Sequence, residues 1–165
     1  MGFDGLSQSL KDRGFRLHDE ILSEEDADEP PIEVLSLDGS KRWWTITRLR
    51  SLVEDAATVP LCLECDAFDL EVCADAIDLF HKSGSAAAVL ERCYGYGLRS
   101  CDVATRAVAA DAESAARLKV KPGHPLLAME RINRGADGRP VHVVQFLMRT
   151  DVVPVVESLV NPSVS

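Results

Sequence analysis

Alternating apolar and polar side chains mark the strands of this chain. Residues 43–53, with the sequence WWTITRLRSLV, alternate most clearly, and residues 59–68, VPLCLECDAF, follow after a short polar connection. A period of two is typical of strands, because successive side chains point to opposite faces of a sheet. Weaker alternation predicts two further strands, at residues 15–22 and 99–110.

The stretch from Lys121 to Asp151 predicts a β-hairpin. Two apolar runs, residues 126–131 and 141–148, flank the dipeptide Asp137-Gly138. Glycine accepts a positive φ without steric cost, so Asp-Gly between two alternating runs indicates a tight turn. The second run is also rich in β-branched residues, which favour strands.

Apolar residues at helical spacing predict four helices. They lie at residues 3–13, 70–82, 85–94 and 111–120. Gly14 follows the first as a stop signal, and Ser85 and Asp111 stand at the N-cap positions of the last two. The segment 32–37, IEVLSL, fits either a short strand or a helical turn.

The order of these elements favours an α+β fold, with an antiparallel sheet flanked by helices. Neighbouring strands are joined as hairpins, and few strand–helix–strand units occur. The chain has 165 residues, which suits one domain with a substantial core. We therefore expect a single domain over residues 1–165.

The net charge of −9 argues against a nucleic-acid surface. We interpret the main acidic run as a solvated loop that ends at Pro30-Pro31. Its members are Glu20, Glu24, Glu25, Asp26, Asp28 and Glu29. No basic stripe is present to follow a phosphate backbone, so we expect the chain not to bind nucleic acid by itself.

The lack of long apolar runs and the number of cysteines predict a cytoplasmic protein with no membrane partner. No apolar run approaches the ~18 residues of a membrane span, and the first residues lack the basic and apolar blocks of a signal peptide. Five cysteines without a paired framework fit a reducing compartment and mostly free thiols.

Common catalytic and metal-binding motifs are not found in the sequence. Cys62 and Cys65 match C-x-x-C, but zinc needs a second pair, and a strand points these two thiols to opposite faces. We interpret them as buried thiols. The four histidines are scattered, and no nucleophile elbow, P-loop or dinucleotide fingerprint occurs. We expect no catalytic residue, no metal site and no cofactor.

Two arginines and a glutamate form the most notable polar pattern. Arg48 and Arg50 share a strand face, and Glu64 lies on the returning strand. One interpretation is a cross-strand ion pair, worth ~0.2–1 kcal/mol. The other is the wall of a site for a small polar anion, because arginine presents a planar fork to carboxylate or phosphate.

Four segments, taken in order, resemble a known family. They are RLR (48–50) with VPLCLE (59–64), Ser85 with a helix ending in CYG (93–95), AADAESAARLKVKPGHPLLAMERI (109–132), and DGRPV (137–141) followed by MRTD (148–151). Together they are similar to the UTRA (UbiC transcription-regulator-associated) domain of HutC-type GntR-family transcriptional regulators. The resemblance covers about residues 2–153.

The resemblance implies a fold, a ligand class and partners. The fold is chorismate-lyase-like, with a ligand pocket against the antiparallel sheet. The ligand is a small anionic metabolite, such as a sugar phosphate, a phosphonate or an organic acid. The domain forms a homodimer and controls DNA binding by an N-terminal winged helix-turn-helix, which is absent from this chain.

The resemblance also implies roles for individual residues. Arg48 and Arg50 hold the anionic group of the effector, and Glu64 takes its hydroxyl or amine groups. Ser85 stands at a helix start whose N–H groups face an anion. Phe3 and Asp4 belong to an N-terminal loop that closes on the ligand, although the usual Ser/Thr hydroxyls of the family are missing there.

The outgoing hairpin strand departs from the family pattern. His142 stands where the family commonly has glutamate, and an aromatic residue is common near Met148. We expect both residues to contact the effector, with His142 and Glu64 reading the end opposite the anion. These departures permit a smaller or less polar acid.

Two other functions are open for the same fold. A chorismate-lyase-like enzyme would also hold carboxylates with arginines, so Arg48 and Arg50 do not separate it from a regulator. The Glu130-Arg131 and DGRPV segments favour the regulator. A dimerisation module with a degenerate pocket is the third possibility, because the loop hydroxyls near Phe3 and Asp4 are missing.

Overall fold

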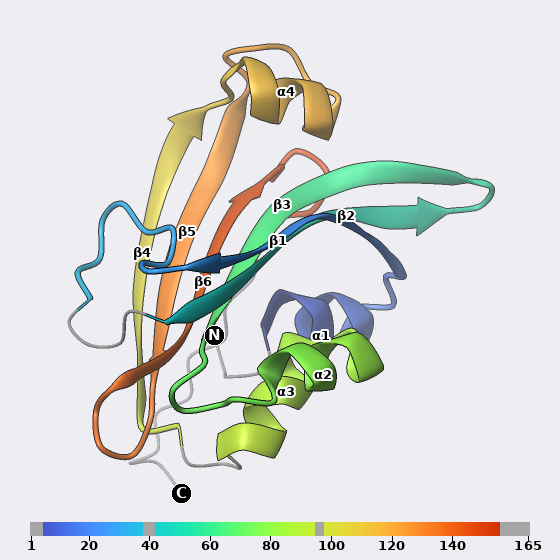
Figure 1. The fold of residues 1–165 in the computed structure, drawn as a ribbon. Helices are drawn as coiled ribbons and strands as arrows, with labels where there is room; N and C mark the ends of the chain where they lie inside the picture. The colour runs from blue at the N-terminus through green and yellow to red at the C-terminus, as the bar shows by residue number, and fades with distance from the viewer. Residues whose placement is uncertain (1–4, 38–41, 95–97, 156–165) are drawn as a thin grey trace, which may run out of the picture.

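The computed structural model describes residues 5–37, 42–94 and 98–155. The helices are α1 (Gly5–Asp12), α2 (Ala76–Ser83), α3 (Ala86–Tyr94) and α4 (Ala112–Leu118). The strands are β1 (Leu17–Ala27), β2 (Trp43–Glu54), β3 (Ala57–Asp69), β4 (Ser100–Ala109), β5 (Pro125–Arg134) and β6 (Pro140–Met148). In the described part of the chain, these strands form one sheet of order β1-β2-β3-β6-β5-β4 (Figure 1).

Every neighbouring pair in this sheet is antiparallel, which confirms the predicted α+β class. β2 and β3 form one hairpin, whose turn places Asp55 at a φ of 48°. β5 and β6 form the predicted second hairpin, and Gly138 takes a φ of 82° in its turn. The pairing of β3 with β6 joins the two halves into one sheet.

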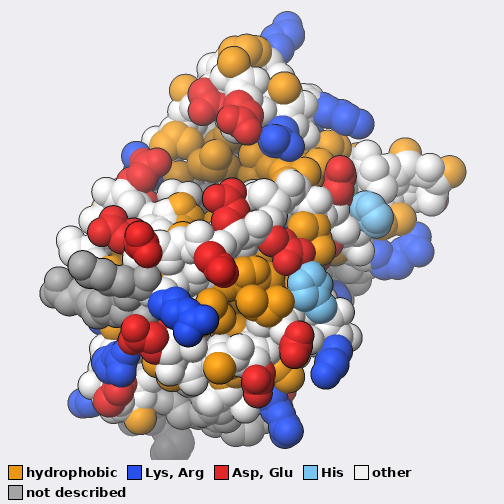
Figure 2. All heavy atoms as spheres, viewed as in Figure 1, with side chains coloured by type: hydrophobic (Ala, Val, Ile, Leu, Met, Phe, Trp, Pro, Cys, Tyr) orange, Lys and Arg blue, Asp and Glu red, His pale blue; other side chains and the backbone are white. Residues whose placement is uncertain are grey.

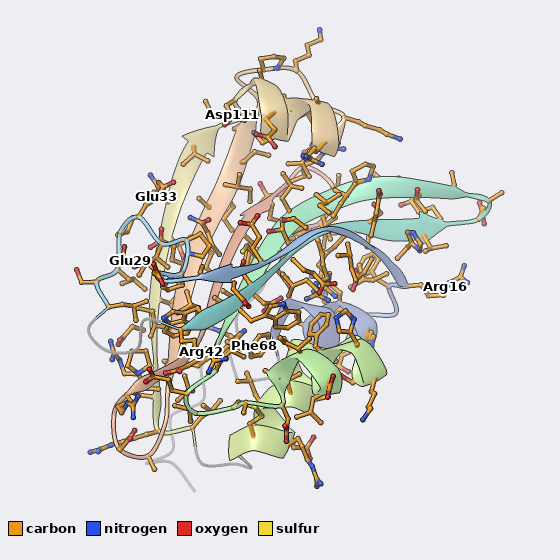
Figure 3. All side chains as sticks on the ribbon, in the orientation of Figure 1. Arg16, Glu29, Glu33, Arg42, Phe68 and Asp111 are labelled. Atoms are coloured by element: carbon orange, nitrogen blue, oxygen red, sulfur yellow. A yellow bond between two sulfur atoms is a disulfide. The ribbon has the colours of Figure 1, made fainter. Side chains whose placement is uncertain are left out.

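Helices α1, α2 and α3 lie on one side of the sheet (Figure 1). The even-numbered residues of β2 from Trp44 to Arg50 face them, because α2 and α3 pack on Trp44 and Ile46. Trp44 lies 5.9 Å from Phe68 and 5.7 Å from Phe80, measured between ring centroids. Phe68 thus lies between the sheet and the helices (Figure 3).

The opposite face is covered by α4 and by residues 28–37. Leu118 of α4 packs in a buried cluster with Leu126, and Asp111 caps this helix as predicted by accepting the Ser114 N–H at 2.8 Å (Figure 3). Residues 28–37 form neither a helix nor a strand, so both interpretations of 32–37 are wrong. Ile32 and Leu35 of this loop nevertheless pack against the buried cluster that contains Trp43.

Glu130 holds the loop 28–37 onto the sheet. Its carboxylate accepts backbone N–H groups of Glu33, Val34 and Leu35 at 2.6, 2.9 and 3.0 Å. Burial opposes the charge on Glu130, but these three donors hold the pKa of its carboxyl below the ordinary value. The Glu130 side chain therefore accepts backbone N–H groups that, in a strand, would be bonded to a neighbouring strand.

Two predicted boundaries were wrong. β1 runs five residues beyond the predicted strand, to Ala27, so most of the acidic run lies on a strand rather than in a loop. The side chains of Glu24, Glu25 and Asp26 are exposed, as expected for a solvated charge run. α2 begins at Ala76, several residues after the predicted helix start at Leu70.

The cysteines were only partly predicted. Cys62, Cys65 and Cys101 are free, but Cys73 and Cys93 form a disulfide with Cα atoms 5.7 Å apart. This disulfide connects the turn before α2 to α3. Helical periodicity placed Cys93 correctly, but the 20-residue separation gave no sign of its pairing with Cys73.

Acidic side chains are spread over the surface, in agreement with the net charge. Figure 2 shows them distributed across the visible face, with basic side chains mostly at its margins. Among the residues that the structure describes, no helix has the length and apolar character needed to cross a membrane.

Candidate functional site

Arg48 and Arg50 project from β2 toward the helices and are buried. Their side chains are 3% and 6% exposed. Arg48 pairs in register with Glu64 of β3, and a β-bulge follows Arg50. The alternation of β2 thus places both guanidinium groups on the same face, as predicted.

Glu64 bridges the two arginines. Its Oε1 accepts Arg48 Nη2 at 2.6 Å and Arg50 Nη1 at 3.1 Å, and its Oε2 accepts Arg50 Nη1 at 3.0 Å. Both oxygens therefore face N–H donors, which is the arrangement that a carboxylate satisfies. The predicted cross-strand ion pair is confirmed.

Asp66 and His142 extend the same cluster across β3 and β6. Asp66 Oδ2 accepts Arg48 Nη2 at 2.8 Å, and its Oδ1 lies 2.9 Å from His142 Nε2. Asn133 Nδ2 lies 2.9 Å from His142 Nδ1. Because an amide nitrogen only donates, Nδ1 accepts, and the ring proton lies on Nε2 and is donated to Asp66.

Asp19 of β1 completes the cluster at its outer side. Its Oδ1 accepts Arg50 Nε at 2.9 Å, and its Oδ2 accepts Arg50 Nη2 at 3.0 Å. The same Oδ2 accepts Arg48 Nη1 at 3.2 Å. The Asp19 side chain is 27% exposed, against 6% for Glu64 and 2% for Asp66.

The cluster sets the protonation of its members. Burial opposes the charge on Arg50, but Glu64 and Asp19 outweigh it and hold the pKa of its guanidinium above the ordinary value. Burial raises the pKa of Glu64, and the two arginines oppose that rise. Burial also opposes ionisation of Asp66, but the His142 hydrogen bond and the Arg48 charge hold the pKa of its carboxyl well below normal.

The junction of α2 and α3 lies against Arg48. Arg48 Nη1 donates to the Gly84 carbonyl at 3.4 Å, and its Cζ lies 4.9 Å from the centroid of the Phe80 ring. Ser85, the next residue, caps α3 by accepting the Ala88 N–H at 3.3 Å. The structure thus places the predicted cap beside the arginines, one residue from a direct contact.

A model of the UTRA domain matches residues 13–153. The chain belongs to the UTRA domain family. No protein of curated function matches this chain by sequence.

Solved structures show the same fold. The effector domain of PhnF from Mycobacterium smegmatis is 18% identical, with a TM-score of 0.74 and coverage of 92% of this chain and 91% of that one. The ligand-binding domain of a protein assigned to the GntR regulators, from Bordetella bronchiseptica, is 28% identical, with a TM-score of 0.65 and coverage of 82% and 84%. The C-terminal domain of the histidine utilization repressor from Pseudomonas syringae pv. tomato is 16% identical, with a TM-score of 0.68 and coverage of 88% and 100%.

Not every predicted residue of this UTRA domain lies in the cluster. Met148 is fully buried in an apolar cluster with Leu10 and Cys62. Phe3 and Asp4 lie outside the described residues. The structure therefore brings together Arg48, Arg50, Glu64, His142 and, one residue away, Ser85.

Three members of the cluster were missed from the sequence. Asp66 was identifiable, because it lies two positions from Glu64 and so shares its face. Asp19 lies two positions from Leu17 and Ile21 and so shares their face, but its approach to Arg50 depends on a register across 31 residues. In the described part of the chain, Asn133 contacts the cluster only through His142.

Two cavities lie elsewhere in the described part of this UTRA domain. One of about 80 Å³ lies beside Glu130 on the opposite face, and an open one of about 480 Å³ lies beside the Cys73–Cys93 disulfide. Neither of these two is lined by Arg48 or Arg50. Among the described residues, no group of three or more His, Cys, Asp or Glu side chains is arranged to hold a metal ion.

Proposed function

We propose that this UTRA domain is the effector-binding and dimerisation part of a cytoplasmic GntR/HutC-type regulator, and that Arg48 and Arg50 bind the anionic group of its effector. The observation that carries this is the pair of guanidinium groups, both buried and on one face of β2. Arginine forks match carboxylate and phosphate geometry, and buried charge-assisted bonds are strong.

The effector that fits this cluster is a small oxyanion with a second polar end. Sugar phosphates, phosphonates and organic acids all have this form. Glu64 and His142 lie beside the arginines and read the second end. Two buried atoms of the cluster, Arg48 Nε and Asn133 Oδ1, have no hydrogen-bond partner among the described residues. A ligand acceptor and a ligand donor would satisfy them.

The family resemblance also suggests roles for other residues at this site. Ser85 and the start of α3 face the anion together with Arg48, and Phe3 and Asp4 close over the ligand. Met148 shapes the apolar wall from within the core. The domain acts by binding rather than by catalysis, and it reaches DNA only through a winged helix-turn-helix outside this chain. Its effector works by favouring one arrangement of the homodimer over another.

A ligand screen with matched arginine variants tests this proposal. Sugar phosphates, phosphonates and organic acids are screened by thermal shift at constant ionic strength, and stabilising ligands are then titrated by calorimetry. Arg50→Lys keeps the charge but removes the fork, so we expect a loss of affinity of about ten- to a hundredfold.

Arg117→Lys is the control, because Arg117 lies on α4 and pairs only with Glu113 in the described contacts. Its affinity should equal that of the wild type. A ligand that binds Arg50→Lys and wild type equally would show that the arginines do not hold it. Release of pyruvate from chorismate would instead favour an enzyme.

A further inference from the structure

Asp19 is bound by the arginines as a ligand carboxylate would be. Arg50 contacts both of its oxygens, through Nε at 2.9 Å and Nη2 at 3.0 Å, which is a bidentate fork. Arg48 adds a third N–H at 3.2 Å. The anion position between the two guanidinium groups is therefore already filled, by a residue of the same chain.

The cluster carries more negative than positive charge. Three carboxylates, from Asp19, Glu64 and Asp66, face the two guanidinium groups of Arg48 and Arg50. An incoming anion meets this excess at short range, where like charges are costly. The anion reaches the arginine N–H groups that these carboxylates now occupy only if one of the three carboxylates leaves.

Asp19 is the carboxylate that is able to leave. It lies on β1, an edge strand paired only with β2, whereas Glu64 and Asp66 lie on β3 between two neighbours. Its side chain is 27% exposed, so it already borders solvent and reaches water by a short movement. A β-bulge between Ile21 and Ser23 interrupts the ladder of β1 close to Asp19.

We propose that Asp19 is a built-in competitor, which occupies the anion position on Arg48 and Arg50 and is displaced by the carboxylate or phosphate group of the effector. This inference rests on the proposed function, because it assumes that these arginines hold the effector.

Displacement of Asp19 determines both the apparent affinity for the effector and which strand moves when the effector binds. The Asp19-bound state lowers the apparent affinity by the fraction of molecules in which the arginines are free. Anions that bind the arginines weakly do not displace Asp19, whereas oxyanions that contact both Arg48 and Arg50 displace it. The movement falls on β1, which follows α1 directly, so it reaches the N-terminal end of the described chain.

Inorganic phosphate is the probe that tests this mechanism. Phosphate is titrated by calorimetry at constant ionic strength into wild type, Asp19→Asn and Glu20→Gln. Glu20 is exposed and points to the opposite face of β1, so its variant removes the same charge away from the arginines. Asp19→Ser is a second variant should Asp19→Asn fold poorly, and thermal melts without phosphate report folding.

We expect Asp19→Asn to bind phosphate at least about tenfold more tightly than wild type, because the internal competitor is gone. Glu20→Gln should stay within about twofold, since only long-range charge changes. Adding Arg50→Lys to Asp19→Asn should remove the gain.

Two results overturn the inference in distinguishable ways. Equal or weaker phosphate binding by the Asp19 variants, with binding that still depends on Arg50, would remove the competitor role and leave the anion site. If neither wild type nor the Asp19 variants bind phosphate or any ligand of the screen through Arg50, the proposed function fails, and the inference fails with it.

Discussion

At the scale of single residues, the molecule is organised by charges that are buried with their partners. Arg48, Arg50, Glu64 and Asp66 are each nearly inaccessible, and each contacts at least one opposite charge. Removing one partner of such a pair leaves a buried charge uncompensated, at a cost of about 3–5 kcal/mol. This is why conservative variants such as Arg50→Lys are the informative ones.

Glu130 gives a residue-scale prediction that is independent of ligand. Glu130→Gln leaves one accepting oxygen for three backbone donors, so the free energy of unfolding should fall by about 1.5–3 kcal/mol at neutral pH. The folded-state pKa of Glu130 is depressed, so its contribution is present above the ordinary carboxyl pKa and is lost as the pH falls through the depressed folded-state pKa.

Urea denaturation at neutral pH and near pH 3 measures this difference. The gap between wild type and Glu130→Gln should narrow at the lower pH. Glu113→Gln is the control, because its side chain is 78% exposed, and it should change stability little at either pH. A gap that is the same at both pH values would contradict the role of the ionised carboxylate.

The part of the candidate site that depends on the alternation of single strands was predictable from the sequence. The period of two fixed the shared face of Arg48 and Arg50, and the following strand brought Glu64 opposite them. Asp19 was not predictable, because its position depends on the register of an edge strand that carries few buried residues. Register is weakly specified in such strands.

At the scale of elements, local signals predicted the hairpins and caps, and tertiary contacts decided the rest. The β5–β6 hairpin and the Asp111 cap follow from their own sequence. Residues 32–37 have an apolar pattern but no regular structure, because Ile32, Leu35 and Leu37 pack individually on the sheet and Glu130 takes the backbone donors. Hydrogen bonds from a loop to a side chain on a distant strand leave no signal in the local sequence.

The Cys73–Cys93 disulfide gives a prediction at this scale. It closes a loop of 20 residues that contains α2, so Cys73→Ser should lower the free energy of unfolding by about 3 kcal/mol under oxidising conditions. Urea melts with and without dithiothreitol measure the effect. Cys101→Ser is the control, because Cys101 is a free thiol on β4.

The reductant should destabilise wild type and the Cys101 variant alike, and it should leave Cys73→Ser unchanged. A wild-type protein whose stability does not respond to the reductant would show that this disulfide does not form or does not constrain the unfolded chain.

At the scale of the whole molecule, the sheet supports two unlike faces. One carries the charged cluster under α1, α2 and α3, and the other is sealed by α4 and residues 28–37 (Figure 1). The face of the described residues seen in Figure 2 carries many acidic side chains, in agreement with the net charge of −9. Within the cluster, Arg48 contacts both Asp19 of the edge strand β1 and the Gly84 carbonyl between α2 and α3.

The most direct test is to observe the arginine side chains while ligand binds. The Nε–Hε resonances of the protein are followed by NMR during titration with inorganic phosphate and with any ligand from the screen. The account predicts that the Arg48 and Arg50 signals shift and saturate together, while that of Arg117 stays in place. Saturable binding that leaves the Arg48 and Arg50 signals unchanged would contradict it.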